Sequence, residues 1–224
     1  MGLGKRHDKR GNLQNGQLNG LAGEKFNTVQ PQRRNVFSLL PDMDSTGTLF
    51  LDRDGVINRR TPGDYIKDPA AFIPEPGAME AIALLRPYFR RIVVVTNQAG
   101  VGKGRMTEAD LHAVHRHMNA LIDAAGGRLD GIYFCPHRPD AGCDCRKPAT
   151  GMAFQAKADF PEIEFSQSWI VGDSASDMAF GHALGMTTVL ITGKEEEAAA
   201  LASLTLDHQF GALLEFAHFL IARV

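Results

Sequence analysis

From residue 48 onwards, short apolar runs alternate with segments of helical periodicity, and this alternation constrains the fold more than any other feature of the chain. The apolar runs are rich in β-branched and aromatic residues, as in strands that are covered on both faces. We predict five strands, at residues 48–51, 92–95, 132–134, 169–171 and 188–191. Strand–helix alternation gives right-handed crossovers and a mostly parallel sheet with helices on both faces. The expected fold is therefore α/β, with three layers in a Rossmann-like arrangement.

The segments between these runs carry start and stop signals of helices. Thr107 with Asp110 three residues later forms a capping-box pattern, and Gly126 ends that segment. Pro87 stops an earlier apolar-periodic segment. We expect helices at residues 76–86, from 107 to the glycine pair, and at 151–159, 176–184 and 211–222.

Composition excludes several classes of protein. The 224 residues are 44% hydrophobic and 22% charged, which is ordinary for a folded domain and unlike collagen, a disordered chain or a disulfide miniprotein. No apolar run approaches the roughly 18 residues of a membrane-spanning helix, so no membrane partner is expected. The net charge of −2 argues against binding of nucleic acid through bulk positive charge.

Residues 1–35 differ from the rest in charge and pattern. They hold seven Lys or Arg and two acids, a net of +5, and they lack an apolar period. Such a segment buries too little surface to offset the entropy of ordering. We therefore expect a disordered basic tail at residues 1–42 and one folded domain at residues 43–224, and a solvated tail is favoured over an anion-binding one.

Polar side chains follow four of the predicted strands, at the edge of the sheet where ligands bind in such folds. Asp52 and Asp54 follow the first strand, and Asp173 follows the fourth. Carboxylates gathered at one point form a hard oxygen site that suits Mg²⁺. Taken alone, two aspartates could equally form a turn.

A possible anion site accompanies these carboxylates. Thr96 and Asn97 follow the second strand and can donate hydrogen bonds to anion oxygens, while Arg146 and Lys147 add positive charge in a polar loop. Metal and cations together neutralise a phosphoryl group, which is the main requirement of phosphoryl transfer.

All three cysteines lie close together in the sequence. With one histidine they give a Cys₃His set on the loop at residues 135–145: Cys135, His137, Cys143 and Cys145. This ligand type and number fit a tetrahedral structural zinc. An odd number of thiols argues against a disulfide framework and favours a reducing compartment, so we expect a cytoplasmic protein.

Four motifs in chain order resemble those of the haloacid-dehalogenase-like (HAD) superfamily of phosphatases. They are the segments 50–58, 96–98, 145–148 and 171–177, and the resemblance covers roughly residues 48–192. Within subfamily IIIA, the combination with a zinc loop resembles the heptose-bisphosphate and histidinol-phosphate phosphatases. The resemblance implies hydrolysis of a phosphomonoester, with D-glycero-D-manno-heptose 1,7-bisphosphate losing its 7-phosphate as the first expectation and histidinol phosphate as the alternative substrate.

The same resemblance implies roles for individual residues. Asp52 would be the nucleophile that forms an aspartyl-phosphate, and Asp54 would protonate the leaving oxygen and then activate water. Thr96 and Lys147 would hold the phosphoryl group. Asp52, the backbone carbonyl of Asp54, and Asp173 would bind Mg²⁺. A contact between Asp177 and the metal is left open.

Substrate selection is expected to fall to short loops. Only 42 residues separate Asp54 from Thr96, and a strand and a helix occupy most of them, so no large cap domain fits. Guanidinium groups suit a second phosphate or a pair of hydroxyl groups. We expect substrate contacts from Arg59, Arg60, Asn97, Gln98 and Arg146, although the first two could equally be solvated surface charges.

Two other classes of function stay open at this point. One is a non-catalytic module that binds a phosphosugar, although the presence of both Asp52 and Asp54 argues against it. The other is a phosphotransferase or mutase, which would need a lid that excludes water. A monomer is the default expectation, and the histidines at 112, 115 and 117 are interpreted as a solvated helix surface.

Overall fold

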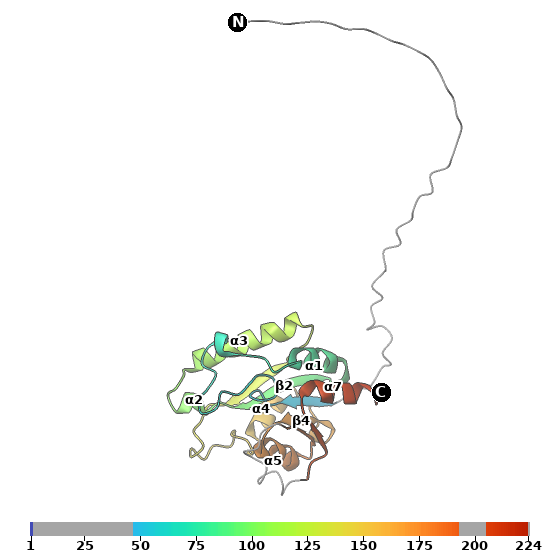
Figure 1. Cartoon of the computed structure of the whole chain (residues 1–224). Coiled ribbons are helices and arrows are strands. Elements are labelled where there is room, and N and C mark those ends of the chain that lie inside the picture. The colour runs from blue at the N-terminus through green and yellow to red at the C-terminus, as the bar shows by residue number, and fades with distance from the viewer. Residues whose placement is uncertain (2–46, 193–204, 224) are drawn as a thin grey trace, which may run out of the picture. The chain divides into compact units, whose positions relative to one another are not determined.

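A parallel sheet forms the centre of the domain. The computed structural model describes Met1 and residues 47–192 and 205–223. In this part the sheet has six strands in the order β3-β2-β1-β4-β5-β6, and every neighbouring pair is parallel (Figure 1). The strands are β1 (Thr48–Leu51), β2 (Arg91–Asn97), β3 (Gly131–Cys135), β4 (Trp169–Gly172), β5 (Thr187–Ile191) and β6 (His208–Phe210).

The prediction of a parallel α/β sheet is confirmed, but its count of five strands is wrong by one. The additional strand β6 pairs with β5 at the edge of the sheet. It has only three residues, and one of them is the polar Gln209. A run this short carries no readable period, so only its pairing identifies it as a strand.

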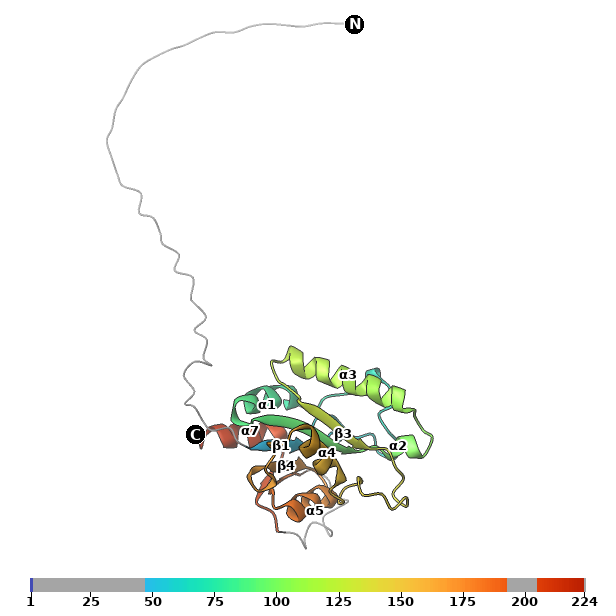
Figure 2. The same cartoon turned by 180° about the vertical axis from the view of Figure 1, so that it is seen from behind.

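Helices cover both faces of the sheet, as the sequence predicts. Figures 1 and 2 show α1, α3 and α7 on one face and α4 and α5 on the other. Each face has its own apolar cluster of buried side chains, with Ile82 and Phe216 in one and Met152 and Phe180 in the other. The helices are α1 (Ala78–Leu85), α2 (Ala99–Gly102), α3 (Glu108–Ala124), α4 (Gly151–Asp159), α5 (Ala175–Leu184) and α7 (Leu213–Ile221).

Local signals set the ends of these helices. In α3 the Thr107 side chain accepts a hydrogen bond from the Asp110 amide, and the Asp110 carboxylate accepts one from the Thr107 amide, so the predicted capping box is present. Helix α1 begins two residues later than predicted, because Gly77 adopts a left-handed conformation with φ of 75°. It ends in a short 3₁₀ turn, Arg86–Tyr88, that contains Pro87.

The register of the strands brings their carboxyl ends to one edge. Leu51 of β1 pairs with Val94 of β2 and Val171 of β4. The Asp52 amide continues this ladder, because it donates a hydrogen bond of 2.9 Å to the Val171 carbonyl. The residues that follow β1, β2 and β4 therefore converge, as a parallel sheet requires.

The connections at residues 52–77 and 136–150 are loops, and the first contains one short 3₁₀ turn. Within residues 47–192 and 205–223, no cap domain is inserted between β1 and α1 or between β3 and α4. The predicted tail at residues 1–42 lies outside the described residues. No helix in the described ranges is long and apolar enough to cross a membrane.

Asp130 fixes the start of β2. Its carboxylate accepts hydrogen bonds from the Ile92 amide at 2.8 Å and from the side chains of Arg91 and Arg128 at 3.2 and 3.0 Å. Only 9% of the side chain is exposed, so its loss leaves one buried amide without its acceptor.

We predict that Asp130→Ala lowers the free energy of unfolding by about 2 kcal/mol, since a buried donor loses its partner. Urea unfolding followed by circular dichroism measures this. The exposed Asp123→Ala, on α3, is the control and changes stability by less than about 0.5 kcal/mol. Equal effects of the two substitutions would contradict the assigned role of Asp130.

Candidate active site

Asp52 lies at the carboxyl end of β1, in the middle of the sheet, and is 6% exposed. Its Oδ1 accepts a hydrogen bond of 2.7 Å from Lys147 Nζ. Burial raises the pKa of Asp52 to about 6, with the nearby charges of Asp177 and Asp54 adding to the rise and Lys147 opposing it. Lys147 thus holds the Asp52 carboxylate in place, but its charge does not fully offset the effect of burial on the pKa.

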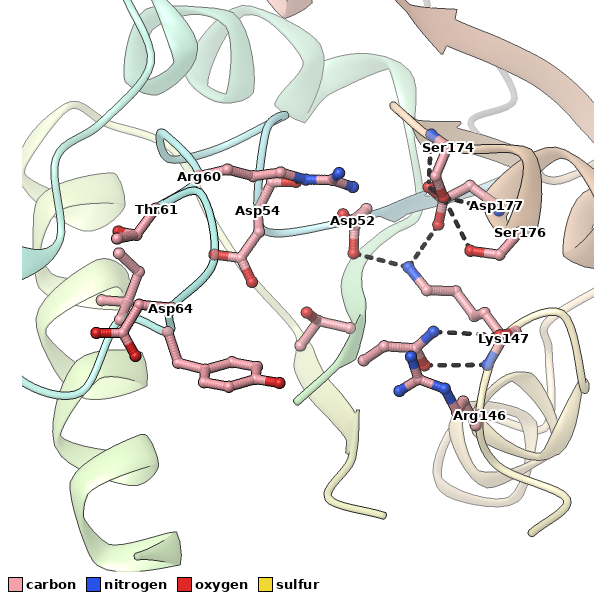
Figure 3. Close-up of a pocket in the computed structure, with 14 residues that line it drawn as sticks. Asp52, Asp54, Arg60, Thr61, Asp64, Arg146, Lys147, Ser174, Ser176 and Asp177 are labelled. Atoms are coloured by element: carbon pink, nitrogen blue, oxygen red, sulfur yellow. Dashed lines mark hydrogen bonds and ion pairs between the residues drawn. The ribbon is translucent and has the colours of Figure 1, made fainter. Parts of the chain in front are cut away.

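Lys147 joins this carboxylate to a second one. Its ammonium forms an ion pair of 2.5 Å with Asp177 Oδ1 and donates a hydrogen bond of 2.7 Å to the Val95 carbonyl (Figure 3). Burial disfavours its charge, but Asp177 and Asp52 outweigh that effect and raise the pKa of Lys147 above its usual value. The lysine is therefore a buried, permanent cation.

A glycine makes room for Asp177. A Cβ added at Gly172 would lie only 2.2 Å from the Asp177 Cβ, so no other residue fits there without displacement of the carboxylate. Asp177 also closes the capping box of α5, because its Oδ2 accepts hydrogen bonds from the Ser174 hydroxyl and amide at 2.5 and 3.1 Å. This geometry explains the Gly-Asp-Ser order at the end of β4.

Asp54 turns toward a different set of partners. Its oxygens accept hydrogen bonds from Arg53 Nη2 at 3.0 and 2.9 Å, from Asn58 at 2.9 Å and from Gln98 at 2.8 Å. Although burial raises the pKa of Asp54, the Arg53 guanidinium and these hydrogen bonds lower it below the ordinary value. The side chain is still 24% exposed, and it lines the same pocket as Asp52.

Thr96 and Asn97 occupy the end of β2, beside Asp52. The Asn97 amide oxygen accepts a hydrogen bond of 3.0 Å from the Lys147 amide, and its Nδ2 donates one of 3.2 Å to the Lys147 carbonyl. Thr96 Oγ1 accepts a hydrogen bond of 2.9 Å from Gln98 Nε2. Asn97 thus fixes the backbone of the loop that carries Lys147, in addition to facing the pocket.

A cavity of about 280 Å³ opens over these residues. Its walls come from the ends of β1 and β2, the start of α5, the loop after β1 and the loop before α4 (Figure 3). The lining residues are Asp52, Asp54, Arg60, Thr61, Asp64, Tyr65, Ile66, Thr96, Asn97, Arg146, Lys147, Ser174, Ser176 and Asp177.

The carboxylates at this site have the chemistry of a Mg²⁺ site. One oxygen from each of Asp52, Asp173 and Asp177 lies within 4.8 Å of the others, and all three side chains are buried. Arg60 reaches the same place, since it donates hydrogen bonds to Asp173 Oδ1 at 2.5 Å and to the Asp54 carbonyl at 3.1 Å. A cation therefore contacts two of the groups that the family resemblance assigns to Mg²⁺.

Two of the expected substrate-binding residues do not line the cavity. Arg59 is exposed, and its amide donates a hydrogen bond to the Ile73 carbonyl. Gln98 is buried and contacts Asp54, Thr96 and Arg53. Arg60, Asn97 and Arg146 are in the cavity wall.

Several residues at or behind the cavity were not predicted from the sequence. The loop residues Asp64 and Tyr65 line the cavity, and only their position after the paired aspartates signals this. Arg53 and His115 are buried and in contact at 3.2 Å. The interpretation of His115 as a solvated helix residue is wrong, because it lies on the face of α3 that also carries the buried Leu111 and Met118.

The Cys₃His cluster is assembled as predicted. The ligand atoms of Cys135, His137, Cys143 and Cys145 all lie within 4.8 Å of one another. The sulfurs of Cys135 and Cys143 are 3.5 Å apart, and His137 Nδ1 lies 3.2 Å from the Cys145 sulfur. A tetrahedral zinc with bonds of about 2.3 Å to sulfur needs ligand separations of roughly 3.5–3.8 Å.

Zinc at this cluster would stabilise the loop that leads to Lys147. Burial raises the pKa of both Cys135 and Cys145, so a bound cation is what would hold these thiols as thiolates. The loop then closes onto α4, where the Gly151 amide donates a hydrogen bond of 2.9 Å to the Asp144 carbonyl. The four ligands fit zinc in type and number, and their atoms lie close enough together to share one ion.

Comparison with known proteins agrees with this geometry. Residues 144–215 match the model of the family described as HAD-hydrolase-like. A D-glycero-alpha-D-manno-heptose-1,7-bisphosphate 7-phosphatase of Mycobacterium tuberculosis is 39% identical over 169 residues, covering 75% of this chain and 88% of that protein. The beta-anomer phosphatase of Pseudomonas putida is 44% identical over 149 residues, covering 66% and 84%. The chain belongs to the HAD-like hydrolase family.

A solved structure extends the comparison to the fold. The D,D-heptose 1,7-bisphosphate phosphatase of B. bronchiseptica superposes with a TM-score of 0.73 at 32% identity, covering 80% of this chain and 99% of that one. That structure is complexed with magnesium and phosphate. The fold of this chain is therefore similar to that of a phosphatase that binds magnesium and phosphate. The carboxylates of the site here are suited to the first of these ligands, and its cations to the second.

We predict that removal of zinc destabilises the domain and lowers its activity. Cys143→Ala leaves three ligands, so zinc content measured by mass spectrometry falls well below one equivalent and Tm falls by about 5–10 °C. Incubation with a strong chelator reproduces both changes in the unsubstituted protein, and kcat falls with them. An unchanged Tm and kcat after metal removal would contradict a structural role for the cluster.

We predict that Arg60→Ala tightens binding of Mg²⁺ by about three- to tenfold at low salt, because a competing cation leaves two of its ligand groups. Isothermal titration calorimetry with MgCl₂ measures the Kd directly. Arg59→Ala is the matched control, and its Kd stays unchanged. Weaker binding in Arg60→Ala would show that the guanidinium does not compete with the metal.

Proposed function

We propose that this chain is a Mg²⁺-dependent phosphomonoesterase that removes the 7-phosphate of D-glycero-D-manno-heptose 1,7-bisphosphate. The observation that carries the proposal is the buried Asp52 held by Lys147, with Asp54 two residues away on the wall of the same cavity. Relatives named as phosphatases of this bisphosphate are 36–44% identical to the chain. Both anomers occur among those names, so the proposal covers the heptose without a choice of anomer.

Asp52 is the proposed nucleophile. Its oxygen attacks the phosphorus, the bond from phosphorus to the sugar oxygen breaks, and an aspartyl-phosphate forms. Lys147 and Thr96 bind the oxygens of the transferred group, where negative charge must be balanced. Asp52, Asp173 and the Asp54 carbonyl would hold Mg²⁺, which supplies further neutralisation of the phosphoryl charge.

Asp54 is the proposed acid and base. It gives a proton to the departing sugar oxygen and then takes one from the water that hydrolyses the aspartyl-phosphate. The pKa of Asp54 is lowered by Arg53 and its hydrogen-bond donors, and a phosphoryl dianion beside it raises that pKa again. An acid at this position favours hydrolysis over a role that preserves the acyl-phosphate.

The rest of the sugar is proposed to contact the loops around the cavity. Arg60 and Arg146 line it, and the Arg146 Nη1 atom is buried without a hydrogen-bond partner in the described structure. A guanidinium without a partner suits a phosphate or hydroxyl group. Asn97 and Gln98 contribute by holding Lys147 and Asp54 in place.

The proposal includes a cytoplasmic monomer. All residues assigned to the reaction belong to one chain and meet at one cavity. The three cysteines are free thiols grouped with a histidine, which agrees with a reducing compartment.

We predict that Asp52→Asn lowers phosphate release by more than about a thousandfold, since removal of the nucleophile leaves no covalent route. A panel with Mg²⁺ compares heptose 1,7-bisphosphate, histidinol phosphate and fructose 1,6-bisphosphate. The heptose is expected to have the highest kcat/KM, and Asp123→Asn, on exposed α3 surface, keeps full activity.

Other outcomes of this panel would be decisive in their own ways. Release that survives in Asp52→Asn would reject the nucleophile assignment. A higher kcat/KM for histidinol phosphate would show that the proposed substrate is wrong, although the reaction would still be hydrolysis of a phosphomonoester. Binding of the phosphosugar without turnover would indicate a non-catalytic module.

A further inference from the structure

Arg53 stands between Asp52 and Asp54 in the sequence, and its side chain is a buried cation that contacts Asp54. It is 1% exposed, and its guanidinium is shared among three side chains. Nη2 donates hydrogen bonds to both Asp54 oxygens and, at 3.1 Å, to Gln98 Oε1. Nη1 faces His115 Nε2 at 3.2 Å. The orientation of Asp54 therefore depends on where this guanidinium is fixed.

The contact with His115 has only one chemical form. A guanidinium has donors and no acceptors, so His115 Nε2 must be the acceptor and the ring proton must be on Nδ1. His115 is 5% exposed, and burial together with the Arg53 charge lowers its pKa to about 3, with His112 adding to this and Asp54 opposing it. The ring is thus a neutral acceptor near pH 7.

The aromatic neighbours of His115 leave its Nε2 to Arg53. The Phe134 ring packs edge-on at 5.8 Å between centroids, and the exposed His112 lies at 6.5 Å on the same helix. Through His115, helix α3 contacts Arg53, which follows the end of β1. Its buried histidine fixes one end of a guanidinium whose other end holds Asp54.

We propose that His115 is a positioning residue, which fixes the Arg53 guanidinium and through it the carboxylate of Asp54 in the place where protons are exchanged with the substrate. The inference rests on the proposed function, since it needs Asp54 to act as acid and base. Acid–base catalysis depends on hydrogen-bond reach, so a rotated Arg53 allows Asp54 to leave its productive position.

The expected effect depends on the leaving group. Asp54 must protonate a sugar alkoxide, whereas p-nitrophenolate departs without that help. Since kcat/KM reports the steps up to loss of the leaving group, the ratio of kcat/KM for the heptose bisphosphate to that for p-nitrophenyl phosphate isolates the acid. A general change in the fold would lower both values and leave this ratio unchanged.

The test measures this ratio in His115→Leu, in which the acceptor is lost. The ratio falls about tenfold, which is part of the roughly 100-fold that a general acid contributes. His115→Gln, whose side-chain oxygen can accept from Arg53, recovers most of the ratio. Asp123→Asn, at an exposed position farther along α3, leaves it unchanged. Thermal melts and Mg²⁺ titration confirm that each variant is folded and binds metal.

A second measurement needs no variant. Nitrogen-15 NMR of the histidines in the unsubstituted protein is expected to show His115 neutral, with its proton on Nδ1. A proton on Nε2 would overturn the inference, as would a ratio in His115→Leu within about twofold of the unsubstituted value. If the unsubstituted protein hydrolyses neither ester, the proposed function fails. If it hydrolyses both and the ratio does not respond, only the role of His115 fails.

Discussion

A buried ion pair network at Lys147 connects most of the elements that build the site. The ammonium touches Asp52 at the end of β1, Asp177 in the first turn of α5 and the Val95 carbonyl in β2. Burial of three charges is tolerated because each has a partner at close range. The sheet brings the strand ends together, and these contacts of Lys147 fix the position of the loop before α4. The positions of Asp52 and Asp177 on the cavity wall are therefore tied to that of Lys147.

Sequence patterns predicted the layers of this fold and the side chains that gather at the ends of its strands. Strand ends in a parallel sheet must converge, so Asp52, Thr96 and Asp173 could be grouped before any geometry was known. The Cys₃His set was readable because its ligands are adjacent in sequence. Strand β6 was not readable, since three residues give no period and only the pairing with β5 identifies them.

The residues behind the cavity were beyond the reach of sequence patterns for a different reason. Gln98 follows Thr96 and Asn97, and this suggests contact with substrate, yet the side chain points into the protein and bonds Asp54. His115 shares its helix with exposed polar residues, and only the rotation of α3 against β3 decides that it is buried. Which nitrogen accepts, and from which cation, depends on packing between segments that are 62 residues apart.

Gly172 shows how a residue without a functional group comes under the same constraint as the reactive ones. Any side chain there would collide with Asp177, and the carboxylate cannot move without loss of its contact to Lys147. Positions without a functional group, such as Gly172, are therefore expected to tolerate substitution as poorly as the reactive residues that they contact. We therefore expect alanine at position 172 to disturb the ion pair between Lys147 and Asp177, although glycine itself has no functional group.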